Sequence, residues 1–186
     1  AQMNGETIEF ASVARDSSVP MSTVKEYFSI LEDTLLGDFL WPWDRSERKK
    51  ARPKFYFFDC GVIRSLQNRL IDPPTPQEKG FLFETFFYNE LKRLRDYHEK
   101  PYELSFWREG KHEIDILVTG PRGPSMAFEC KTSTDTISDA TRTAFRKRFP
   151  DLPLFVASLK DAHPRKLDNG VVILPWRQAL NTFLDG

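Results

Sequence analysis

The sequence is poor in the side chains that zinc sites and disulfide frameworks require. Its 186 residues include two cysteines and three histidines, and neither set has the spacing of zinc ligands. Cys60 and Cys130 stand in apolar stretches, which predicts reduced core thiols of the kind found in cytosolic proteins. The composition therefore argues against both a zinc finger and a disulfide-stabilised secreted domain.

A net charge of one sign and long hydrophobic runs are also missing. Lys and Arg together number 27, as do Asp and Glu, so any affinity for nucleic acid must come from local patches. No apolar run approaches the roughly 18 residues of a membrane span, and the start has no signal peptide. We therefore expect a cytoplasmic protein without a membrane segment. Because the start, Ala1-Gln2-Met3, lacks an initiating methionine, we also expect the chain to be part of a longer one.

The apolar content is sufficient for a packed core. Hydrophobic residues make up 40% of the chain and aromatic residues 13%, which is well above the content of disordered chains. The stretch "LIDPPTPQEK" has three prolines in four residues, so neither a helix nor a central strand continues through it. We therefore predict two domains, at residues 1–72 and 78–186.

The first domain is predicted to begin with two helices within residues 6–36, separated at "DSSVP". Ser22 is expected to cap the second helix, whose apolar positions include Val24 and Phe28. Two short helices joined by such a turn resemble a helix-turn-helix. The aromatic stretches "LLGDFLWPW" and "PKFYFFDCG" that follow are typical of the two strands of a wing. This domain is therefore expected to be winged-helix-like.

The second domain alternates between helical and strand patterns. The predicted order is a helix at 80–97, strands at 103–109, 111–120 and 125–133, a helix at 137–149, strands at 152–159 and 171–175, and a helix at 176–184. This order predicts an α/β or α+β fold.

Two neighbouring strands combine an apolar alternation with charged residues. In "HEIDILV", Glu113 and Asp115 alternate with apolar residues, and in "SMAFECKTS", Glu129 and Lys131 do the same. If the strands pair as a hairpin, Asp115, Glu129 and Lys131 converge. Close carboxylates repel each other unless a cation lies between them, and their hard oxygen atoms suit Mg²⁺ or Mn²⁺. A lysine beside them can orient water and stabilise charge that develops on a phosphate.

A third carboxylate, Glu84, lies in the helical stretch "FLFETFFY", where the preceding helix can carry it toward the same cluster. A Glu-bearing helix followed by strands with Asp115 and with Glu129-Cys130-Lys131 resembles the PD-(D/E)xK nuclease superfamily. In place of the proline in that motif this chain has isoleucine.

The resemblance implies a restriction-endonuclease-like α-β-β-β-α-β core and a role for each residue of the cluster. Asp115 and Glu129 would hold the metal, with Glu113 as an accessory ligand. Lys131 would orient or activate water, and Glu84 would assist the metal or the water.

A narrower resemblance covers most of the chain. The stretches "VPMSTVKEYFSILEDTLL", "PKFYFFDCGV", "GFLFETFFYNELKR", "EIDILV" and "FECKTS" resemble the C-terminal region of a large prokaryotic family of AAA-type ATPases. In that family an ATPase module precedes a winged helix and a domain of unknown function with a nuclease-like core. The resemblance implies that the ATPase module of the same polypeptide is a partner. ATP would bind only there, because this chain contains no P-loop motif.

Two basic patches are candidate nucleic-acid contacts. They comprise Arg48, Lys49 and Lys50 in a polar loop, and Arg142, Arg146 and Lys147 on the helix at 137–149. The second helix of the helix-turn-helix pattern carries only one base, Lys25, and several acids, which disfavours DNA binding through that helix.

Three functions therefore remain open. The first is a metal-dependent nuclease that acts on DNA or RNA. The second is a non-catalytic module that regulates its ATPase or docks it to DNA or protein, with the charges forming a satisfied ion-pair cluster. The third is an oligomerisation domain, which would make the protein a homo-oligomer.

Overall fold

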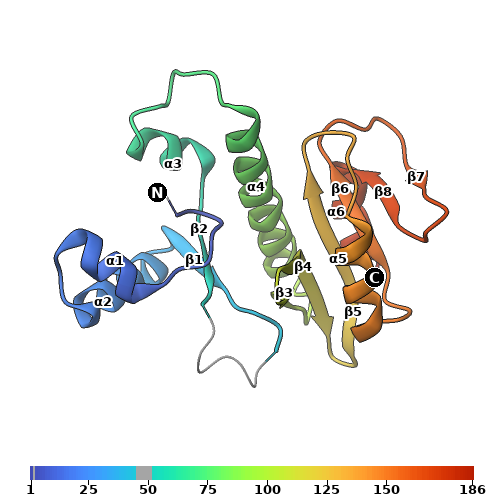
Figure 1. Cartoon of the computed structure of the whole chain (residues 1–186), viewed down its shortest axis with the longest axis horizontal. Helices are drawn as coiled ribbons and strands as arrows, with labels where there is room; N and C mark the ends of the chain where they lie inside the picture. Colours follow the sequence, from blue (N-terminus) through green and yellow to red (C-terminus); the bar gives the residue numbers. More distant parts are fainter. Residues whose placement is uncertain (2, 45–51) are drawn as a thin grey trace. The chain divides into compact units, whose positions relative to one another are not determined.

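The structure, a computed structural model, describes residues 1, 3–44 and 52–186. It divides into two compact units, Ala1–Pro73 (unit 1) and Pro74–Gly186 (unit 2), which are described separately (Figure 1). No helix in the described part of the chain combines the length and the apolar composition needed to cross a membrane.

Unit 1 combines helices with a two-stranded antiparallel sheet (Figure 1). Its elements are α1 (Phe10–Ser17), α2 (Met21–Asp33), β1 (Gly37–Leu40), β2 (Lys54–Phe57) and α3 (Cys60–Leu66). Helix α3 was not predicted, although Asp59 supplies a cap signal because its carboxylate accepts a hydrogen bond from the backbone N–H of Val62 at 3.0 Å.

Both helices at the start of unit 1 differ from the sequence prediction. Helix α1 begins only at Phe10, because Thr7 bridges to Lys54 and the N–H of Ile8 donates to the carbonyl of Pro53, which keeps this segment extended. The predicted Ser22 cap is wrong. Helix α2 starts at Met21 directly after Pro20, which occupies the N-cap position, and no side chain caps it.

An aromatic cluster holds the helices of unit 1 against its sheet. The rings of Phe28, Phe39 and Phe55 lie 4.9–5.5 Å apart, and Phe10 adds edge contacts from α1. Gly37 allows this packing, because a Cβ atom there would lie 2.2 Å from the Phe55 ring. Such edge-to-face arrangements stabilise a small core beyond the area they bury.

Unit 2 contains a six-stranded mixed sheet with the order β3-β4-β5-β6-β8-β7. Its elements are α4 (Pro76–Tyr97), β3 (Glu103–Glu109), β4 (His112–Gly120), β5 (Gly123–Lys131), α5 (Asp139–Arg148), β6 (Leu154–Ser158), β7 (Arg165–Lys166), β8 (Val172–Pro175) and α6 (Trp176–Asp185). The α/β class is confirmed. The two-residue strand β7 was not predicted, since it is too short to show a period.

Helix α4 begins where the proline-rich stretch ends. Thr75 and Glu78 form a reciprocal capping box, and Pro76 occupies the first turn, where its missing N–H costs nothing. On the packed side, the ring of Phe87 lies 5.5 Å from that of Phe128 on β5. Helix α5 contacts the sheet through Phe145, whose ring lies 5.2 Å from that of Trp107 on β3, and Figure 1 shows α4 and α5 on opposite sides of the sheet.

The packing of α4 generates a stability prediction. Phe87 is fully buried, so Phe87→Ala leaves a cavity under α4 and is expected to cost about 3–5 kcal/mol in the free energy of unfolding. Hydrogen exchange of the α4 and β5 amides measures the loss within unit 2. Tyr97→Ala on the same helix is the control, because Tyr97 is 84% exposed and its change should remain within about 0.5 kcal/mol. Equal effects of the two substitutions would contradict the packing.

Candidate functional site

Strands β4 and β5 bring Asp115 next to the Glu-Cys-Lys triplet. Ile116 pairs with Phe128 in the antiparallel register, and Asp115 lies next to Ile116 in β4, just beyond this last pair. The Asp115 Oδ2 atom accepts a hydrogen bond from the backbone N–H of Cys130 at 2.8 Å. The Asp115 side chain therefore reaches across to β5 and binds its backbone.

Glu129 and Lys131 form an ion pair on one face of β5. Two residues apart on a strand, they point to the same side of the sheet. The Nζ of Lys131 lies 2.9 Å from Oε1 of Glu129, with side-chain exposures of 29% for the lysine and 12% for the glutamate. A pair so far removed from solvent is screened much less than a surface salt bridge.

The charge state of Lys131 follows from this environment. Burial lowers the pKa of Lys131, but the carboxylates of Glu129 and Asp115 raise it by more, and its net pKa lies above the ordinary value of 10.5. At neutral pH Lys131 is therefore a cation that donates hydrogen bonds, and it is not available as a general base.

Glu113 is directed toward a different partner. It pairs with Arg108 in the register of β3 and β4, and the two side chains form an ion pair. To act as an accessory metal ligand, Glu113 would have to break its ion pair with Arg108 or share its carboxylate between Arg108 and the metal.

Glu84 lies on the packed face of α4. It precedes the buried Tyr88 by one turn and the buried Leu91 by two turns, so the three side chains line the same face of the helix. The aromatic contact between α4 and β5 near Glu84 is that of Phe87 with Phe128. Its membership of the cluster stays a prediction.

The basic patch on α5 is partly used within the protein itself. Arg142 forms an ion pair with Asp139 at 2.7 Å, and the Arg146 guanidinium donates to the carbonyls of Pro150 and Leu152 at the end of the helix. Lys147 is exposed. The other patch, Arg48, Lys49 and Lys50, lies outside the described residues. Nucleic-acid contact by either patch stays a prediction.

Sequence reasoning missed a polar group beside Lys131. Ser158, at the end of the parallel neighbour β6, pairs with Lys131 in register and is fully buried. Its hydroxyl donates to Asp161 at 2.7 Å, and Arg165 donates to the other oxygen of the same carboxylate. These hydrogen bonds, first from Ser158 and then from Arg165, lower the pKa of Asp161. The sequence did contain a signal for this residue, since Ser158 directly follows the apolar residues of β6. Ligands bind outside the carboxyl ends of parallel strands, so a small polar residue at that position is a candidate site residue.

The donor set fits a magnesium-type ion better than zinc. The described residues contain no group of three or more His, Cys, Asp or Glu side chains placed to hold a metal, and structural zinc sites require four such ligands. Mg²⁺ in contrast commonly takes one or two carboxylates and completes its shell with water and substrate phosphate oxygens. Asp115 and Glu129 match that requirement in number and kind.

The raised pKa of Lys131 generates a prediction about stability and pH. Lys131→Met leaves the Glu129 carboxylate without its ammonium partner and is expected to cost about 1–3 kcal/mol in the free energy of unfolding at neutral pH. A raised pKa means that this stabilisation is fully present below 10.5 and is lost as pH rises through the higher folded-state value. Urea unfolding across that range measures the difference. The exposed Lys79→Met is the control, and a difference that persists at high pH would contradict the ion pair.

Comparisons with known proteins cover both units. The family described as "Domain of unknown function (DUF4143)" matches residues 79–179, and the one described as "Domain of unknown function (DUF8612)" matches residues 1–71. The first domain is found in AAA-ATPase-associated proteins. Neither a curated protein nor a solved structure matches the chain. Because the DUF4143 match spans more than half of its residues, the chain belongs to the DUF4143 family of proteins.

Proposed function

We propose that unit 2 is a divalent-metal-dependent nuclease domain of the PD-(D/E)xK type, and that the chain is the C-terminal region of a prokaryotic AAA-type ATPase with a winged-helix-like unit 1. The observation that supports this most is the cluster on β4 and β5. Asp115 binds the backbone of Cys130, and Glu129 holds Lys131 at 2.9 Å. Two carboxylates that can hold a metal and one cation on the same strand pair are groups that promote phosphodiester hydrolysis.

Asp115 and Glu129 would hold Mg²⁺ or Mn²⁺, with Glu84 assisting. When bound, the metal supplies a Lewis acid for a phosphate oxygen and lowers the pKa of a coordinated water. Lys131 stays protonated at neutral pH, so its part is to donate to a phosphate oxygen and to stabilise the charge that develops there. Glu129 positions this ammonium group through their ion pair, which gives Glu129 a second role besides metal binding.

A non-catalytic docking module is the second candidate, and a specific observation favours it. Glu129 is already paired with Lys131, and Glu113 with Arg108. The protein itself thus neutralises much of the negative charge that would attract a metal. Such a module would bind DNA or its own ATPase without turnover.

A cleavage assay separates the two candidates. The full chain is incubated with supercoiled plasmid, linear duplex, single-stranded DNA and RNA, in Mg²⁺, in Mn²⁺ or in EDTA. Asp115→Asn and Glu129→Gln are the informative variants, because the amide oxygens still accept from Cys130 and Lys131 while the charge is removed. The nuclease proposal expects metal-dependent cleavage by the wild type and a loss of about 10²-fold or more in each variant.

Asp96→Asn on α4 is the matched control, because Asp96 is exposed and its carboxylate pairs with the adjacent Arg95. This variant should cleave at the wild-type rate. Absence of cleavage by the wild type under every condition, with all proteins folded, would overturn the nuclease proposal and leave the docking module. Cleavage that survives both Asp115→Asn and Glu129→Gln would place the activity elsewhere.

A further inference from the structure

An arginine is held against a tryptophan at the start of α6, outside the cluster on β4 and β5. The guanidinium Cζ of Arg177 lies 4.4 Å from the centroid of the Trp176 ring, within the roughly 6 Å at which a cation is attracted to an aromatic face. Arg177 is exposed, and among the described residues no carboxylate forms an ion pair with it. The indole therefore orients this guanidinium, but the described protein does not neutralise its charge.

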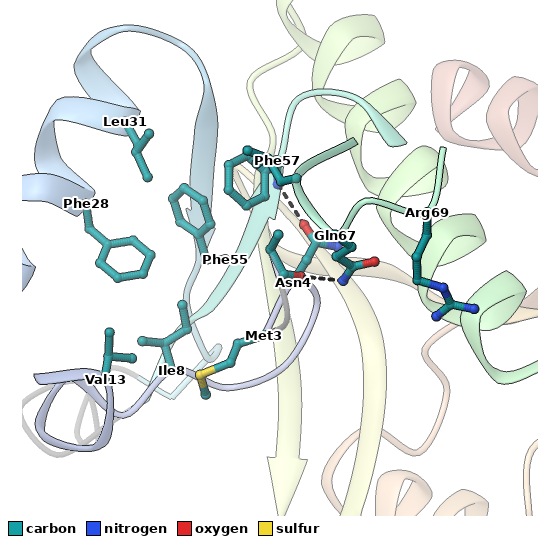
Figure 2. Close-up of a pocket in the computed structure, with 12 residues that line it drawn as sticks. Met3, Asn4, Ile8, Val13, Phe28, Leu31, Phe55, Phe57, Gln67 and Arg69 are labelled. Atoms are coloured by element: carbon teal, nitrogen blue, oxygen red, sulfur yellow. Dashed lines mark hydrogen bonds between the residues drawn. The ribbon is translucent and has the colours of Figure 1, made fainter. Parts of the chain in front are cut away.

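Two other arginines each lack one of these properties. Arg108 lies over the ring of Phe106, 5.6 Å from its centroid, but it also forms an ion pair with Glu113. In unit 1, Figure 2 shows the guanidinium of Arg69 pointing away from the apolar side chains that line a pocket. Arg177 instead combines contact with an aromatic ring and an uncompensated charge, which suits it to receive a ligand.

The Trp176–Arg177 pair lies at the carboxyl edge of the parallel strands, in line with Lys131. Lys131 pairs with Ser158 across β5 and β6, and Ser158 pairs with Pro175 across β6 and β8. Trp176 directly follows Pro175. Neighbouring strands are about 4.8 Å apart, so the backbone of Pro175 lies about 10 Å from that of Lys131. At a rise of about 3.4 Å per nucleotide, a single strand covers this distance in about three steps.

Apolar surface borders the charged cluster along this edge. The ring of Phe86 on α4 packs edge-on against Trp176, with the two centroids 5.2 Å apart, and so helps to fix the indole. The same contact brings the part of α4 that lies two residues beyond Glu84 to this edge. Leu159, which directly follows Ser158, is 46% exposed. Aromatic and aliphatic side chains of this kind suit the face of a nucleobase better than the backbone of a nucleic acid.

We propose that the Trp176–Arg177 pair is a stacking platform for an unpaired nucleobase, and that the substrate of the nuclease site is single-stranded nucleic acid. The base stacks on the outer face of the guanidinium, opposite the indole, while a phosphate of the same strand lies at Lys131. Bases within a duplex are already stacked and paired, so their faces are not accessible to such a platform. This inference rests on the proposed nucleic-acid chemistry of the cluster and specifies the substrate class for it.

Binding measured in EDTA tests the platform on the full chain without cleavage. Fluorescence anisotropy follows a labelled DNA strand of about 12 nucleotides, a length within the site sizes of single-strand-binding folds. The same strand in a duplex and an abasic strand of equal length are the comparisons. The wild type is expected to bind the single strand about tenfold more tightly than the abasic strand, because the stacking of a base is lost. It is also expected to bind the duplex more weakly than the single strand.

Two variants test whether this preference comes from the Trp176–Arg177 pair. Arg177→Lys keeps the charge but lacks the planar guanidinium, and Trp176→Leu removes the ring that orients it. Each should weaken the single strand about tenfold and leave the abasic strand nearly unchanged. Arg122→Lys is the matched control, because Arg122 is exposed and directly precedes β5, at the end opposite Lys131. Circular dichroism and thermal unfolding establish folding, and the exposed position of Arg177 keeps the test valid if Trp176→Leu does not fold.

Equal affinity for the base-bearing and abasic strands, tighter binding of the duplex, or unchanged binding by folded Arg177→Lys would overturn the platform. Cleavage in Mg²⁺ by a protein with no such preference would overturn this inference and leave the nuclease proposal standing. Base-dependent binding that Arg177→Lys abolishes, without cleavage in any metal, would support the platform and favour the non-catalytic module.

Discussion

The antiparallel register of β4 and β5 is the constraint on which the rest of unit 2 depends. The hairpin turns through Pro121 and Arg122, and Gly123 adopts a φ of 117°, a conformation that favours glycine. An irregularity shifts the register between Val118 and Thr119, and beyond it Ile116 pairs with Phe128, whose ring contacts Phe87 on α4. A slip of one residue would move every side chain of β5 to the other face and would destroy both the core and the cluster.

The cluster also shows how a largely apolar sheet accommodates charge. Asp115 is satisfied in part by a backbone N–H of the neighbouring strand, and Glu129 by Lys131 two residues later. Glu129 and Lys131 are two residues apart in sequence, and Asp115 and Cys130 lie on paired strands. The β4–β5 hairpin by itself therefore builds most of the site. The same contacts raise the pKa of Lys131 and keep its side chain a cation at neutral pH. This property suits phosphate recognition and equally suits a static ion-pair cluster.

Unit 1 is stabilised mainly by aromatic packing. Its core is a cluster of phenylalanine rings that packs over a two-stranded sheet, and such a small sheet cannot cover all of its apolar surface. Large hydrophobic side chains accordingly remain exposed, including Tyr27 at 58% and Ile30 at 49% on α2. With Glu26 and Asp33 on the same helix, α2 presents an apolar and acidic surface, unlike the basic surface that DNA requires. This agrees with the sparse basic content of α2 noted in its sequence.

Periodicity alone determined the α/β class, the long helix α4, the three strands that follow it and the polar residues on them, because these segments carry strong repeats of 3.6 or 2 residues. It could not reveal α3 or β7, which are too short to show a period, nor the start of α1, which the bridge between Thr7 and Lys54 decides. Only the tertiary structure assigned partners to the charged residues. Arg108 forms an ion pair with Glu113, and Arg146 donates to the carbonyl of Leu152 beyond the end of α5. Ser158 comes to lie beside Lys131, 27 positions away in sequence. Such pairings depend on register and on which strands become neighbours, and no local pattern in the chain encodes either.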